Sequence, residues 1–204
     1  MPSKPETRPY RMGARAESAQ RTREQVLDAA AECFGEQDYD AVSLKEIAAR
    51  AGVGLQTVVR TGGSKEALFA LVAERFLSAT MAGFDLSRLH TWQDALAHLM
   101  TFYETFGDRT MRVITQEHRV PLVREYTQRS RALQAAWIQL HHGDAFEGLS
   151  DSQRKRRMAM VLTLTGARTW YALRRDYGLS PEDTLRNVTE QLTALLDMSG
   201  PNAT

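Results

Sequence analysis

Residues 43–65 read SLKEIAARAGVGLQTVVRTGGSK, and their pattern predicts two short helices joined by a sharp turn. Ser43 stands at the position of a helix N-cap, and Glu46 three residues later completes the pattern of a capping box. Gly52 follows the first helix at a position that favours a left-handed backbone, which glycine adopts without strain. The second helix, residues 54–60, directs Gln, Thr and Arg side chains outward. This helix–turn–helix pattern is typical of domains that place their second helix in the major groove of DNA.

The segment that begins at Arg21 resembles the N-terminal part of the TetR family of bacterial transcriptional regulators. The likeness covers about a quarter of the chain, and both spacing and residue type agree across four successive predicted elements. Three groups of residues carry it: Val26, Leu27, Ala29, Ala30, Cys33 and Phe34; Ser43, Leu44, Ile47, Ala48, Ala51, Gly52 and Val53; and Ser64, Lys65, Glu66 and Leu68. The resemblance implies a three-helix DNA-binding domain, followed by a helical domain that binds an effector and forms a dimer.

Three positions depart from the family pattern. Val59 stands where many members have a tyrosine that contacts a phosphate, so one positioning contact is missing. Gly62 replaces a phenylalanine that would act as an apolar plug under the third helix. Asp38 stands at a corner that usually holds glycine, although Asp tolerates a left-handed backbone better than most residues.

The composition is that of a globular protein, with 43% hydrophobic and 25% charged residues and a net charge of +1. This charge alone does not indicate a nucleic-acid partner. The single cysteine, Cys33, excludes a disulfide framework, and its place on an apolar helix face predicts core packing. The sequence has neither an apolar run near 18 residues nor a signal-peptide core, so we expect a cytoplasmic protein without membrane contact.

Residues 1–20 are predicted to form a flexible basic arm. Residues 1–23 contain six basic and two acidic side chains, and residues 1–20 contain three prolines without a helical apolar stripe. Such an arm could add contacts to phosphates or to the minor groove, or it could be a solvated tail. The sequence leaves both readings open.

The whole chain is predicted to be all-α, with about nine helices, because helical periodicity recurs and no segment alternates as a strand would. The predicted domains are a helix–turn–helix DNA-binding domain at 21–80 and a helical effector-binding and dimerisation domain at 81–204. Within the second, we expect helices at 91–107, 108–118 and 121–140, a long one that opens at Ser150 and includes MAMVLTLTGARTWYAL, and a last one from Pro181. The last two helices are expected to form the homodimer interface, as the resemblance implies.

Candidate site residues follow from the predicted recognition helix. Gln56 is expected to read adenine, and Arg60 to reach guanine or a phosphate. Leu55 begins the helix that would lie in the groove, and the expected phosphate contacts are Ser43, Thr57, Thr61 and Lys65. The family resemblance also implies an effector pocket between the middle helices, whose candidate lining residues are Trp92, Leu96, Met100, Tyr103, Met111 and Trp137.

These features predict a dimeric transcriptional regulator, a ligand-responsive repressor that binds a palindromic DNA operator. The alternative is a helical enzyme or adaptor with a vestigial helix–turn–helix, which Val59 and Gly62 favour. No motif for a catalytic residue, a metal ligand or a cofactor is present, so none is predicted.

Overall fold

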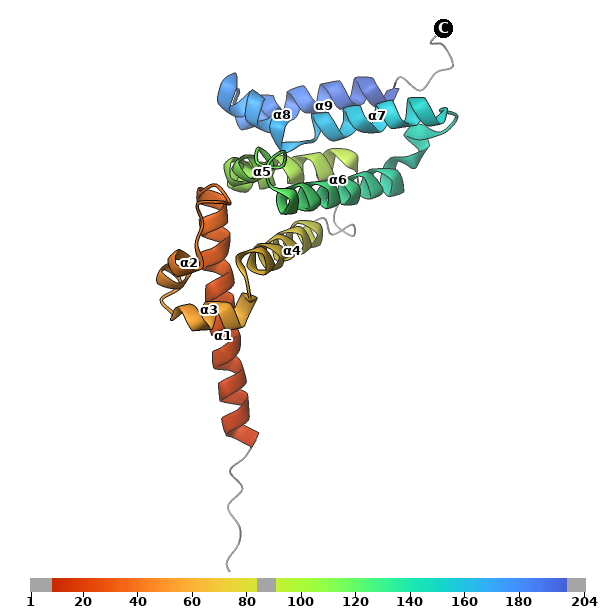
Figure 1. Cartoon of the computed structure of the whole chain (residues 1–204). Helices are drawn as coiled ribbons and strands as arrows, with labels where there is room; N and C mark the ends of the chain where they lie inside the picture. Colours follow the sequence, from red (N-terminus) through yellow and green to blue (C-terminus); the bar gives the residue numbers. More distant parts are fainter. Residues whose placement is uncertain (1–8, 84–90, 198–204) are drawn as a thin grey trace, which may run out of the picture. The chain divides into compact units, whose positions relative to one another are not determined.

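The computed structural model describes residues 9–83 and 91–197 of the 204-residue chain (Figure 1). Within these ranges the chain forms nine α-helices and no strand, which confirms the predicted all-α fold. None of the helices within residues 9–83 and 91–197 has the length and hydrophobicity of a membrane-spanning segment. The contacts divide the chain into two compact units, residues 1–74 and 75–204.

Unit 1 contains α1 (Pro9–Glu36), α2 (Leu44–Arg50), α3 (Leu55–Gly62) and the first part of α4 (Lys65–Gly83). Each helix turns an apolar face inward, because apolar residues recur at helical spacing along it. The buried core of the unit includes Val26, Ala30, Cys33, Phe34, Ile47, Val58, Leu68 and Phe69.

An aromatic cluster closes this core where α1 meets α4. Phe34 stacks on Tyr39 at a centroid distance of 5.8 Å, and both rings meet Phe69 edge to face at 5.1 and 5.4 Å. Cys33 lies beside Phe34 with no exposed surface, and burial raises the pKa of its thiol. The predicted core role of Cys33 is therefore confirmed.

Helix α1 begins earlier than the sequence predicts. It starts at Pro9 and runs for 28 residues, so residues 9–20, expected to belong to a flexible arm, are helical; residues 1–8 lie outside the described residues. The alanines, arginines, glutamate and glutamine of this stretch have high helix propensity even without an apolar stripe. Thr22 therefore lies inside the helix, where its hydroxyl donates to the carbonyl of Ser18 at 3.0 Å.

Unit 2 is a bundle that starts with the second part of α4. Its further helices are α5 (Trp92–Ile114), α6 (Pro121–His142), α7 (Asp151–Leu164), α8 (Ala167–Tyr171) and α9 (Pro181–Asp197). A 3₁₀ helix (Gly143–Phe146) follows α6, and a π-helical turn (Ala172–Asp176) follows α8. Helix α5 packs against α6, α8 and α9, and α7 packs beside α9. The largest fully buried side chains of unit 2 are Trp170, Phe146, Val123, Val188 and Thr184.

Helix α5 continues through Gly107, where the sequence predicts a stop. Gly107 is buried, and a Cβ atom built on it would lie 2.2 Å from Cζ3 of Trp170. The glycine is therefore present to admit the indole ring and not to end the helix. The two helices expected at 91–107 and 108–118 are one, and its N-terminus has a full capping box between Thr91 and Asp94.

The long helix expected from Ser150 through MAMVLTLTGARTWYAL is broken in the middle. The N-terminal capping box of Ser150 and Gln153 is present, but α7 ends at Leu164 and α8 begins after Gly166. Gly166 has an extended backbone with ψ of 154°, which cannot continue a helix. The break turns Trp170 toward α5.

We expect Gly107→Ala to destabilise unit 2 by about 1–3 kcal/mol, because the new methyl group overlaps a fully buried indole that cannot move away. In an ordinary helix interior the same change would stabilise by about 0.5–1 kcal/mol, so the sign separates the two cases. Urea unfolding followed by circular dichroism measures the difference.

The matched control is Gly143→Ala, where the added Cβ meets only the side-chain amide of Gln139 at 3.2 Å. That amide is the end of a flexible side chain and can swing aside. A Gly107→Ala protein as stable as the Gly143→Ala protein would contradict the proposed role of Gly107.

Candidate nucleic-acid interface and ligand cavity

The turn between α2 and α3 has the predicted geometry. Gly52 has φ of +65°, and the amides of Gly52 and Val53 donate to the carbonyls of Ala49 and Ala48 at 3.2 and 3.0 Å. These two bonds form a Schellman motif, which satisfies the last carbonyls of α2. The tight turn fixes the direction in which α3 leaves α2.

Ser43 caps α2 as predicted, because its Oγ accepts from the amide of Glu46 at 3.2 Å. The other half of the expected capping box is replaced. The Glu46 carboxylate accepts from the side-chain amide of Gln37, which follows α1 in the chain. Glu46 therefore links α2 to the end of α1.

Helix α3 presents one outer face and is anchored by the opposite one. Val58 is buried in the core, while Leu55, Gln56 and Arg60 are exposed, as expected for residues that enter a groove. Val59 is also exposed on this face. The outer face therefore combines two polar and two apolar side chains.

The two threonines of α3 lie nearer the body of the unit. Thr57 and Thr61 are both half-buried, and the Thr61 hydroxyl donates to the Thr57 carbonyl at 2.9 Å. Arg23 of α1 donates to the Thr61 carbonyl at 3.4 Å, so it holds the C-terminal end of α3. Sequence reasoning missed Arg23, because 38 residues separate the partners and no local pattern relates them.

Lys65 has a structural partner within unit 1. Its ammonium donates to the carbonyls of Tyr39 and Asp40 at 3.0 and 3.4 Å and lies 4.6 Å from the centre of the Tyr39 ring. These contacts tie the first turn of α4 to the corner after α1. A phosphate contact by Lys65 stays a prediction, and Lys65 would have to exchange or share these partners to make it.

The packing of Leu68 explains why position 62 is a glycine. A Cβ atom at this position would lie 2.6 Å from Cδ1 of Leu68, which is fully buried. Leu68 occupies the space that a side chain at position 62 would need.

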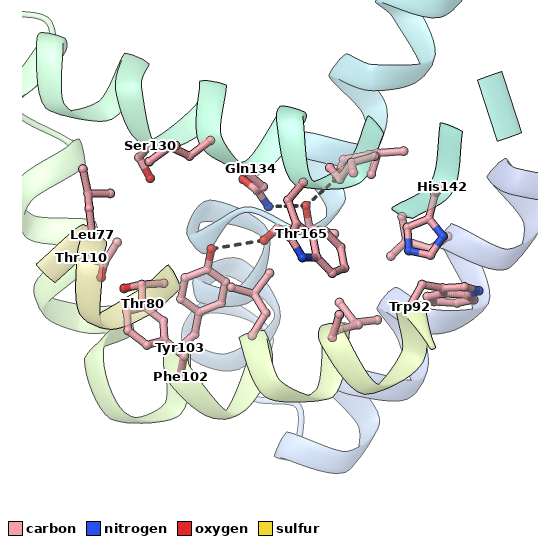
Figure 2. Close-up of a pocket in the computed structure, with 18 of the residues that line it drawn as sticks. Leu77, Thr80, Trp92, Phe102, Tyr103, Thr110, Ser130, Gln134, His142 and Thr165 are labelled. Atoms are coloured by element: carbon pink, nitrogen blue, oxygen red, sulfur yellow. Dashed lines mark hydrogen bonds between the residues drawn. The ribbon is translucent and has the colours of Figure 1, made fainter. Parts of the chain in front are cut away.

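Unit 2 contains a partly open cavity of about 150 Å³ (Figure 2). Engineered apolar cavities of similar volume bind benzene. Four of the six candidate residues line it: Trp92, Leu96, Tyr103 and Trp137. Met100 and Met111 do not; Met100 is buried in the surrounding core, and Met111 packs against that core. None of the lining residues is Asp, Glu, Lys or Arg.

A short chain of hydrogen bonds forms the polar centre of the cavity. Gln134 Nε2 donates to Thr165 Oγ1 at 2.7 Å, and the Tyr103 hydroxyl donates to the Thr165 carbonyl at 3.2 Å. Burial raises the pKa of Tyr103, and burial also raises the pKa of Tyr126 to about 12, so both phenols are neutral near pH 7. Gln134 and Thr165 were not predicted, because they are 31 residues apart and face each other only through the bundle.

Polar groups also mark the two ends of the cavity. Figure 2 shows Thr80 and Thr110 at one end and Trp92 and His142 at the other. Thr80 lies on the second part of α4, together with the lining residues Phe76 and Leu77.

Among the described residues no group of three His, Cys, Asp or Glu side chains could hold a metal ion.

Residues 26–72 match the family model described as bacterial regulatory proteins, tetR family. The fold is shared with a putative TetR-family transcriptional regulator from a Rhodococcus species, at 12% identity and a TM-score of 0.69 over 86% of this chain and 99% of that one. A tetR-family regulator from Streptomyces coelicolor gives 19% identity and a TM-score of 0.66 over 87% and 83%.

NalD of Pseudomonas aeruginosa, described as the secondary repressor of the MexAB-OprM multidrug efflux pump, gives 19% identity and a TM-score of 0.60 over 86% and 96%. No curated protein sequence matches the chain. The matched family comprises regulatory proteins rather than enzymes, and at these identities the solved structures establish the fold.

If the outer face of α3 enters the major groove, Gln56→Ala should weaken binding to a specific duplex by about 1–3 kcal/mol. Binding to random duplex DNA should change little, because phosphate contacts supply that affinity. Fluorescence anisotropy with both duplexes at one salt concentration measures the two effects. Gln93→Ala, an exposed glutamine in the first turn of α5, is the matched control. Equal losses on both duplexes would remove the assignment of Gln56 as a base-reading residue.

Proposed function

Because residues 26–72 match the tetR family model and the chain shares its fold with solved regulators of that family, we propose that the chain is a DNA-binding transcriptional regulator of this family. It would act as a homodimeric repressor that a small, uncharged ligand releases from a palindromic operator. One observation carries the ligand part of this proposal. The cavity of unit 2 is lined by apolar and polar side chains without any Asp, Glu, Lys or Arg, and three of its lining residues belong to α4, whose first turn lies in unit 1.

On the DNA side, each protomer would insert α3 into a major groove. The exposed Gln56 and Arg60 are the polar groups of its outer face, and hydrogen bonds from them suit adenine and guanine edges. Thr57 and Thr61 of this helix and Ser43 at the N-cap of α2 remain candidates for phosphate contacts. A two-fold protein places two such helices on two half-sites, which is why the operator should be palindromic.

The dimer is proposed to form through α7 and α9, which pack side by side in unit 2. Helix α7 exposes Ala159, Met160 and Thr163, of which Met160 is 52% exposed. Helix α9 exposes Thr193 and Ala194 in its C-terminal part. Small side chains around one large apolar residue allow close contact with a second copy in an isologous interface.

The core residues of α9 are unsuitable as probes of this interface. Leu192 is only 3% exposed and lines the cavity, so a charge there would disrupt the fold of the protomer itself. Met160 is the appropriate position, because its side chain already meets solvent in the isolated protomer.

Met160→Glu should abolish the dimer without unfolding the protomer. Each copy would bury an unpaired carboxylate at the interface, which costs several kcal/mol. Light scattering should then report a monomer, and operator affinity should fall with it. The control is Leu140→Glu on α6, where the native side chain is 73% exposed. A Met160→Glu protein that stays dimeric would place the interface elsewhere.

The ligand is proposed to be neutral, with an apolar body and one polar group bound near Gln134. A charged ligand would lose its hydration in a cavity that has no Asp, Glu, Lys or Arg in its lining, and that loss is expensive. Gln134 uses Nε2 for Thr165, which leaves its amide oxygen as an acceptor for a ligand hydroxyl or amide. A ligand that displaces Phe76, Leu77 or Thr80 would move α4, and α4 also carries Lys65.

A matched set of small probes tests the ligand chemistry. Phenol should bind more tightly than toluene by about 0.5–1.5 kcal/mol, the net contribution of one hydrogen bond. Benzoate and benzylammonium should not bind measurably, because each would have to bury a charge. Gln134→Leu should remove the preference for phenol over toluene. The measurement is quenching of tryptophan fluorescence, to which Trp92 and Trp137 of the cavity contribute.

The same titration with operator duplex present tests the regulator itself. Linkage requires that DNA weaken the binding of an inducing ligand by the same factor by which the ligand weakens DNA binding. Phenol that binds equally with and without operator would not be an inducer. Benzoate binding as tightly as phenol would contradict the proposed neutral ligand.

A further inference from the structure

The outer face of α3 carries two apolar residues, Leu55 and Val59. Base reading by Gln56 and Arg60 does not assign them a function. Leu55 is 40% exposed and Val59 is 44% exposed, and they lie one helical turn apart. Among the described residues only six large hydrophobic side chains are 36% exposed or more: Leu55, Val59, Phe106, Leu140, Met160 and Tyr177. Two of the six therefore share a single turn of an eight-residue helix.

The rotation of α3 about its axis is fixed, so this pair cannot turn inward. Val58 is 1% exposed in the core of unit 1, and Thr61 is half-buried behind it. With about 100° between successive residues, the outer face has Leu55 and Val59 along one side and Gln56 and Arg60 along the other. Any partner of α3 meets these two strips together.

The major groove offers one apolar feature, the C5-methyl group of thymine, and it identifies an A·T pair together with its orientation. Helix α3 contains no acidic residue, and Arg60 on the same face favours a polyanion over an apolar protein surface. We propose that Val59 and Leu55 are specificity-determining residues that contact thymine methyl groups beside the adenine read by Gln56. This inference rests on the proposed insertion of α3 into the major groove.

The assignment gives Val59 a function in place of the phosphate contact that a tyrosine would make. A branched aliphatic side chain cannot hold a phosphate, but it excludes water from a neighbouring methyl group. Gln56, flanked by the apolar strip, would then read adenine while Val59 or Leu55 reads thymine. The half-site should accordingly be rich in A·T pairs under the first turn of α3.

The test begins with selection of a preferred duplex from a random pool by the full-length protein. Each thymine of the selected duplex is then replaced singly by deoxyuridine, which removes only the methyl group. At one or more positions of each half-site the Kd should rise about fourfold, the factor that corresponds to about 0.8 kcal/mol for one buried methyl-sized group. Positions outside the half-sites should show no effect.

Variants of α3 then identify which side chain contacts the thymine methyl group. Val59→Ala or Leu55→Ala should weaken binding to the thymine duplex and abolish the deoxyuridine penalty at its own position, as coupling between contacting groups requires. Gln56→Ala is the matched control, which should bind more weakly and keep that penalty. Thermal unfolding should be nearly unchanged in all three, because the three native side chains are exposed.

Each failure has a distinct meaning. A wild-type protein without any sensitive thymine, or penalties that persist unchanged in Val59→Ala and Leu55→Ala, would overturn thymine readout while DNA binding stands. A change of oligomeric state in Val59→Ala with a flat deoxyuridine scan would assign the pair to a protein contact and also overturn it. Selection that enriches no sequence would overturn the proposed operator binding together with this inference.

Discussion

The packing of Trp170 against the bare backbone of Gly107 is the contact on which unit 2 depends. The indole is fully buried, and its Nε1 donates to Glu104 Oε1 at 2.8 Å, so its one polar group is satisfied. Arg174 donates to both oxygens of Glu104 at 2.7 and 3.0 Å, and this pairing lowers the pKa of the Glu104 carboxyl. The ring, the carboxylate and the guanidinium together lock α8 and the π-helical turn onto α5.

The polar part of the cavity depends on the helix break that brings Trp170 to α5. For Trp170 to reach α5, the chain must leave α7 at Thr165 and turn at Gly166. That turn places the Thr165 carbonyl within reach of the Tyr103 hydroxyl and the Thr165 side chain opposite Gln134. The polar centre of the cavity is thus created by the helix break, while the apolar walls come from the faces of α4, α5, α6 and α9. Neutral polar groups amid apolar walls suit a ligand whose recognition is by shape and one hydrogen bond.

Unit 1 shows how two helices that are too short to be stable alone can present a rigid surface. Helices α2 and α3 have seven and eight residues, below the length at which isolated helices persist in water. They are held by the buried Ile47 and Val58 and by the Schellman turn at Gly52. Because one side of α3 is committed to the core, its other side is a defined array of Leu55, Gln56, Val59 and Arg60. Rigidity of this kind favours discrimination between base sequences.

The sequence by itself determined the helix–turn–helix, because its signals are local: the Ser43 cap, the left-handed glycine at position 52, and an apolar period that separates Val58 from Gln56. Four of the six candidate ligand-site residues line the cavity, and the sequence indicated them because they lie on the apolar faces of α5 and α6; ligand binding by them stays a prediction. Only the tertiary structure decided why Gly107 continues a helix, why Gly62 carries no side chain, and which polar groups meet in the cavity. Gly107 depends on Trp170 and Gln134 on Thr165, and both partners are distant in sequence. Gly62 depends on the buried Leu68, which the local path of the backbone brings against it. Helical periodicity reports which face of a helix is buried, but not which side chain it is buried against.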